Sequence, residues 1–188
     1  GPGEKIHDRI AASWARLLGA WKHFRQSVDR LPKDDAGTTL TRNAFLFPLL
    51  QELGFGTPQP AKALDLNGKT YAISHAWAPR VLIHLLGWHT GLDARSPGKR
   101  GAAAASPHGL VQDALNRSPE HLWAIVSNGR ELRLLRDNRA FSRAAYVSFD
   151  LEHIFDGKRL HDFTALWLLA HASRFEGVAD KDTWIERW

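Results

Sequence analysis

Arginine and lysine side chains are concentrated in two parts of this sequence, where they could bind phosphate groups. Five arginines fall between positions 130 and 143, opposed there only by Glu131 and Asp137. Guanidinium groups bind phosphate oxygens in pairs of hydrogen bonds, so arginines along one exposed face of a hairpin would contact duplex DNA. An edge strand protected by charge has the same pattern, and both interpretations stay open. The DNA-binding candidates are Arg42, Arg95, Lys99, Arg100, Arg130, Arg133, Arg136, Arg139 and Arg143.

Aromatic side chains are the second kind of group that could contact nucleic acid, by stacking on bases. The chain has eight tryptophans. Trp14, Trp21 and Trp167 lie on the apolar faces of predicted helices, which favours a role in the core. We therefore keep only Trp77 and Trp88 as candidates for stacking.

Several kinds of catalytic and metal chemistry have no support in the sequence. There is no cysteine, so disulfides, thiolate–zinc sites and cysteine nucleophiles are excluded. No phosphate-binding glycine loop, dinucleotide fingerprint or nucleophile elbow is present. The ten histidines do not form a metalloprotease pair, since His161 and His171 are ten residues apart on one predicted helix. We expect no catalytic residues and no metal site.

Composition and charge indicate an ordinary folded protein with a basic excess. The chain has 188 residues, and 25 Lys and Arg against 20 Asp and Glu give a net charge of +5. That excess is compatible with nucleic acid without requiring it. No apolar run approaches the roughly 18 to 20 residues of a membrane span, so we expect a cytoplasmic protein without membrane contact.

The predicted elements that would position these side chains alternate between helices and short strands. An apolar stripe predicts a helix from Ile6 to Leu31, and a second helix containing Pro48 follows over residues 40–53. Asn67-Gly68 and Asn128-Gly129 each predict a hairpin. Ser106 followed by Pro107 predicts the start of a short helix, and a last helix is expected over 160–175. The order predicts an α/β domain, a small mixed sheet flanked by helices.

Most of residues 40–175 resemble one protein family. The resemblance lies in Thr41–Gly54, in Ser106–Ser118 continuing through 122–129 to 134–138, and in 145–152 and 163–175. These segments are similar to the N-terminal region of large adenine-specific DNA methyltransferases of restriction-modification and phage-defence systems, the type IIG class and its relatives in DISARM and BREX islands.

The resemblance implies a restriction-endonuclease-like fold of the PD-(D/E)XK kind. In that family a carboxylate and an acid-x-Lys set on neighbouring strands hold magnesium. The corresponding segments here, Tyr71–His75 and Val81–Leu86, contain no acid and no lysine. The methyltransferase's own Asn-Pro-Pro-Tyr motif is absent too, so S-adenosylmethionine would be a cofactor of the parent protein and not of this part.

We therefore expect a non-catalytic, nuclease-like N-terminal domain of a defence-associated DNA adenine methyltransferase. It would contribute DNA binding or subunit docking in phage restriction, with double-stranded DNA and other subunits of the defence system as partners. One alternative is an active magnesium-dependent nuclease using Asp65 or Asp93 together with Glu52. Another is a pure protein-interaction module.

The expected organisation has four parts. Residues 1–3 are interpreted as the remnant of a cleaved tag, because the chain begins Gly-Pro-Gly and contains no methionine. Residues 4–37 form an N-terminal helix, and 38–176 form the nuclease-like α/β domain. Residues 177–188 would begin a connection to a downstream region.

Overall fold

A six-stranded mixed sheet forms the centre of the protein in the computed structural model, which describes residues 5–77, 80–95, 104–137, 146–176 and 183–187. The strand order is β1-β4-β5-β6-β7-β8. β5 and β6 are parallel, and the other neighbouring pairs are antiparallel. The strands are β1 (Gln59–Pro60), β4 (His75–Trp77), β5 (Val81–Leu85), β6 (Trp123–Ser127), β7 (Glu131–Arg136) and β8 (Tyr146–Asp150).

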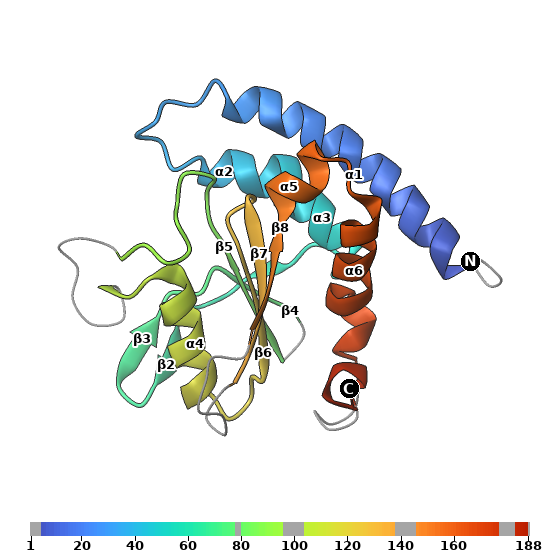
Figure 1. The fold of residues 1–188 in the computed structure, drawn as a ribbon. Coiled ribbons are helices and arrows are strands. Elements are labelled where there is room, and N and C mark those ends of the chain that lie inside the picture. Colours follow the sequence, from blue (N-terminus) through green and yellow to red (C-terminus); the bar gives the residue numbers. More distant parts are fainter. Residues whose placement is uncertain (1–4, 78–79, 96–103, 138–145, 177–182, 188) are drawn as a thin grey trace.

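Helices cover both faces of this sheet, which confirms the predicted α/β class (Figure 1). On one face lie α1 (Ile6–Val28), α2 (Thr38–Thr41), α3 (Phe47–Glu52), α5 (Leu151–Asp156) and α6 (Leu160–Ala170). On the other face, α4 (Pro107–Arg117) packs together with the separate hairpin of β2 (Leu64–Leu66) and β3 (Lys69–Tyr71). Each face of the sheet therefore has its own core.

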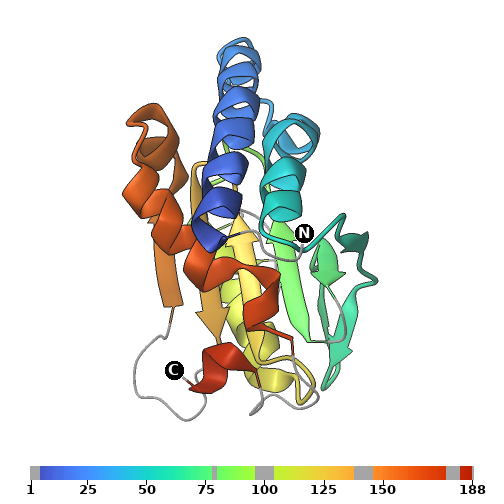
Figure 2. The same ribbon diagram turned by 90° about the vertical axis from the view of Figure 1, so that its right-hand side faces the viewer.

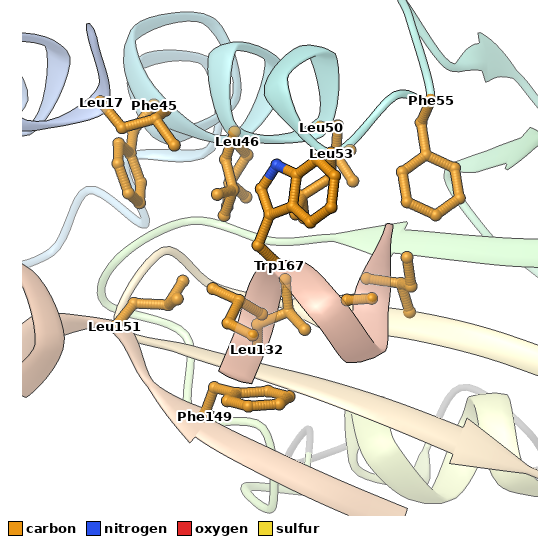
Figure 3. Packing of buried hydrophobic residues seen from close by; sticks show 14 of the residues in the cluster. Leu17, Phe45, Leu46, Leu50, Leu53, Phe55, Leu132, Phe149, Leu151 and Trp167 are labelled. Carbon is orange, nitrogen blue, oxygen red and sulfur yellow. The ribbon is translucent and has the colours of Figure 1, made fainter. Parts of the chain in front are cut away.

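The larger core lies beneath α1, α3 and α6 and is rich in aromatic rings. Trp21 contacts Phe45 and Phe155 at centroid separations of 4.7 and 5.3 Å. The indole of Trp167 extends from α6 toward Leu50 of α3 and Leu53 directly after that helix (Figure 3). All six of these residues are buried, so the core role predicted for the helix tryptophans is confirmed for Trp21 and Trp167.

The second predicted helix contains a local change of geometry caused by its proline. α2 continues into a π-helical turn, Arg42–Leu46, before α3 begins. Pro48 has no N–H, and its ring would crowd the carbonyl four residues earlier in a regular helix. The π-helical turn contains the residue whose carbonyl the Pro48 ring would crowd, and its wider geometry makes room for the ring. The helix therefore continues into α3 and does not end at this point.

Both predicted Asn-Gly hairpins are present, but the strand between them differs from the expectation. Asn67 and Gly68 have φ values of 52° and 75°, as a tight two-residue turn requires. The segment Tyr71–His75 is not one strand. The chain bends after Tyr71, leaves the small hairpin, and enters the main sheet as β4.

The two ends of the chain pack on the same body (Figure 2). α1 contributes Leu17 and Phe24 to the larger core, so it belongs to the same folded unit as the sheet. Near the C-terminus, Trp184–Arg187 forms a 3-10 turn, and Ile185 packs against that core. No helix in the described ranges is long and apolar enough to cross a membrane.

Candidate functional site

Arg133 lies in a charged cluster on the α4 face of the sheet. Its two Nη atoms donate to the two carboxylate oxygens of Asp93, each at 2.7 Å, and its Nε donates to Glu131 at 2.6 Å. Only 9% of its side chain is exposed. The hydrogen bonds to Asp93 raise the pKa of Arg133, with burial opposing them. Arg133 is therefore a paired structural cation and not a free phosphate ligand.

Arg136 points to the opposite face of the same strand, because residues three apart on a strand alternate sides. Its Nε and Nη2 donate to the two oxygens of Glu186 at 3.0 and 2.8 Å. Trp123 Nε1 donates to the same carboxylate at 2.7 Å. The expected single exposed face of arginines is thus not formed by β7, and Arg136 instead fixes the 184–187 turn onto the sheet.

Arg42 is also used inside the fold. Its Nε and Nη2 donate to the carbonyl oxygen of Leu85 at 3.1 and 2.6 Å, which satisfies the last carbonyl of β5. Burial lowers the pKa of Arg42. This arginine connects the π-helical turn to the end of a central strand.

Arg95 and Arg130 are the two candidates with exposed side chains in the described ranges. Arg130 lies 3.5 Å from Glu152 and over the ring of Trp88, with 5.6 Å between guanidinium carbon and ring centroid. These two cations can reach an external ligand. The remaining candidates, which lie outside the described residues, are Lys99, Arg100, Arg139 and Arg143.

The two tryptophans considered for stacking are occupied by neighbours from the same chain. Trp88 is only 6% exposed and packs against Phe24, and Arg25 lies 4.6 Å from its ring centroid. Trp77 is partly buried, and its ring meets Phe55 edge-on at 5.1 Å. Trp88 is therefore a core residue with no face open to a base.

The three acids of the nuclease alternative lie apart and have separate partners. Glu52 accepts hydrogen bonds from Arg16 and Ser13 of α1, which lower its pKa in spite of burial. Asp65 accepts from Thr70 within the small hairpin, and Asp93 is paired with Arg133 on the α4 face. No group of three potential ligands able to hold a metal occurs in the described ranges. Glu52, Asp65 and Asp93 therefore do not form a shared magnesium site.

A cleft of about 550 Å³ opens beside the Arg133 cluster, between the loop after β5 and the start of α5. Four carboxylates line it against one lining arginine, Arg130. Glu152 is 3.3 Å from Arg25, and Asp150 accepts a hydrogen bond from the backbone N–H of His153. With Arg133 and Arg25 counted, the four acids still outnumber the nearby arginines by one, so this cleft does not attract a DNA backbone. The lining acids are Asp93, Glu131, Asp150 and Glu152.

The ion pairs of the arginines were not predicted, although Glu131 was recognised as an opposing charge. The pair of Glu131 and Arg133 could have been predicted, since residues two apart on a strand share a face. The pairs made by Asp93 and Glu186 could not, because these acids lie 40 and 50 residues from the arginines that they bind.

The chain matches no family model, no curated protein and no solved structure.

Proposed function

We propose that this chain is a non-catalytic, restriction-endonuclease-like domain of a defence-associated DNA adenine methyltransferase, and that it acts by docking to other subunits of that system. The family part of this proposal rests on the sequence resemblance. S-adenosylmethionine would be bound by the methyltransferase region of the parent protein. The docking part rests on one structural observation, the character of the outermost strand β8.

The two outer strands of the sheet differ in how well they are protected against pairing. β1 has two residues, and one of them is Pro60, which lacks the N–H that a new strand would need. β8 has five residues with no proline and no lysine. Tyr146 and Val147 on it are 45% and 44% exposed. Short edges with proline resist strand addition, whereas a longer apolar edge invites it.

Charge pairing argues against DNA contact as the main role. Arg42, Arg133 and Arg136 are each bonded to a carbonyl or carboxylate of the same chain. DNA binding remains a second candidate, because Arg95 and Arg130 are exposed on neighbouring loops near one cleft.

Docking is tested by co-expressing the chain with the methyltransferase subunits of its system and purifying it by affinity after nuclease treatment. We expect a subunit to be retained, and Val147→Lys to release it, since a lysine on an edge strand opposes pairing. Ile6→Lys is the matched control because Ile6 is 42% exposed on α1, away from β8. Equal retention by both variants would rule out docking through β8.

The second candidate is tested by titrating duplex DNA at several salt concentrations. Contact with phosphates gives an affinity that falls steeply as salt rises, and each lost contact lowers that slope by about one. If Arg95→Ala combined with Arg130→Ala changes neither affinity nor slope, the two exposed arginines are not DNA ligands.

A nicking assay with supercoiled plasmid separates the proposal from the nuclease alternative. The separated and paired acids predict no cleavage with magnesium at high protein concentration. Magnesium-dependent nicking that disappears in Asp65→Ala or Asp93→Ala would restore the nuclease interpretation.

A further inference from the structure

A small polar pocket lies between the start of α1, the end of α3 and the end of α6, on the face of the sheet opposite α4. Its volume is about 220 Å³. A water molecule occupies about 30 Å³ of liquid, so the pocket has room for a small polyatomic ion with some water. Its lining residues are Arg9, Ala12, Ser13, Arg16, Gln51, Glu52, Gly54, Trp167 and His171.

The ring of Trp167 forms part of the wall of this pocket. The side chain is 2% exposed, and its Nε1 has no hydrogen-bond partner in the described part of the chain. Buried indole N–H groups normally have a partner, and an unpaired one is costly. Figure 3 shows this indole crossing from α6 to α3, the two elements that border the pocket.

His171 offers a ring N–H to this pocket. Its Nδ1 accepts a hydrogen bond from the backbone N–H of Ser173 at 3.2 Å, so the proton of the neutral ring is on Nε2. Burial, aided by the charges of Arg9 and Arg174, lowers the pKa of His171 to about 4, which keeps the ring neutral at pH 7. A Cβ on Gly54 would lie 2.9 Å from Nε2, so only glycine leaves that edge of the ring open.

The charges around the pocket leave one cation in excess. Glu52 is the acid in the lining, and its oxygens accept from Arg16 at 2.6 and 2.7 Å and from Ser13 at 2.7 Å. Arg9 has no acidic partner in the described ranges, and its guanidinium lies over the Trp167 ring at 5.5 Å from the centroid. A guanidinium without an acidic partner in the described ranges, beside an N–H donor, is the chemistry that recognises an oxyanion.

We propose that this pocket binds a phosphate group, with the Arg9 guanidinium and the His171 Nε2–H as its ligands. Arg9 supplies the charge, the histidine N–H supplies direction, and the Trp167 ring forms the adjoining wall. The carboxylate of Glu52 lies in the same lining, and its pairing with Arg16 offsets its repulsion of the anion. The phosphate can be free or can be the end of a nucleic acid strand.

The test follows the indole N–H signals of the eight tryptophans by NMR in the intact chain, with Trp167→Phe identifying the Trp167 signal. We expect inorganic phosphate to move that signal saturably, and chloride at equal ionic strength to leave it in place. A 5′-phosphorylated oligonucleotide and its unphosphorylated form make up the second arm. A shift with free phosphate alone identifies the free ion, and a shift that needs the 5′-phosphate identifies a strand end.

Variants of α1 make the result specific. Arg9→Ala should weaken phosphate binding about tenfold, the loss of one charge-assisted contact. Lys22→Ala removes the same charge from an exposed position further along α1 and should leave binding unchanged. If the Trp167 signal responds to neither form of phosphate, or responds equally in Arg9→Ala, the pocket is not a phosphate site.

Discussion

At the scale of single residues, three of the candidate arginines, Arg42, Arg133 and Arg136, are bonded within the fold. Their number and spacing were visible in the sequence, and so was their capacity to bind oxyanions. Their actual partners were not, because Asp93 and Glu186 come from loops and turns far along the chain. The sequence could therefore identify the cations, but it could not tell a paired guanidinium from a free one.

Arg133→Ala should destabilise the fold by about 1–3 kcal/mol. It removes a mostly buried cation and leaves the partly buried Glu131 and the exposed Asp93 without their charged partner. Urea unfolding measures the change. Arg95→Ala, on an exposed side chain, should stay within about 0.5 kcal/mol of the parent chain. Equal small effects in both variants would show that the Arg133 cluster contributes little.

Asp113 should control part of the acid unfolding. Burial raises its pKa, but hydrogen bonds from Lys69, Tyr71 and Arg117 outweigh burial and bring the pKa to about 2. A carboxylate with a lowered pKa stabilises the fold above its unfolded pKa of about 4, and this stabilisation is lost as pH falls from about 4 to 2. Solvent screening reduces it to about 1 kcal/mol.

Asp113→Asn should therefore flatten the stability curve between pH 4 and 2, as measured by urea unfolding at each pH. Asp29→Asn is the control, since Asp29 is 68% exposed and 3.9 Å from its nearest cation. If the free energy of unfolding of Asp113→Asn fell between pH 4 and 2 as steeply as that of the parent chain, Asp113 would not control this part of the acid unfolding.

At the scale of elements, turn chemistry was the most informative signal. The two Asn-Gly pairs and the Ser106 cap are found where they were predicted, and Ser106 Oγ accepts from the Gly109 N–H at 3.1 Å. β4 was not predicted, because three residues are too few to show an alternating pattern. Its position depends on pairing with β5, which is a tertiary contact.

Two glycine-to-alanine changes should have opposite effects on stability. A Cβ on Gly87, in the loop after β5, would lie 2.0 Å from the carbonyl oxygen of Ala36, so backbone must move. We expect a loss of about 3 kcal/mol, the upper end for overpacking. Gly19 lies within α1 with open space around its Cβ position, so alanine should stabilise by about 0.5–1 kcal/mol. Thermal unfolding measures both changes. A Gly87→Ala variant as stable as the parent chain would contradict the close approach of Gly87 to the Ala36 carbonyl.

At the scale of the whole molecule, one sheet separates two sets of groups that the sequence could not place. The Arg133 cluster lies on the α4 side, and the pocket of Trp167 and His171 lies on the other. The α/β class followed from the order of predicted elements. The side chains that meet on each face depend on the register of the strands and on the crossover between β5 and β6. A single sequence reveals neither.

The central claim is that β8 is the docking edge, and amide hydrogen exchange of the purified complex tests it most directly. We predict that the amides of Tyr146–Asp150 exchange more slowly in the complex than in the isolated chain, while those around β1 keep their rates. Slower exchange means that new hydrogen bonds form along the edge. Unchanged exchange of β8 in a complex that still assembles would contradict the claim.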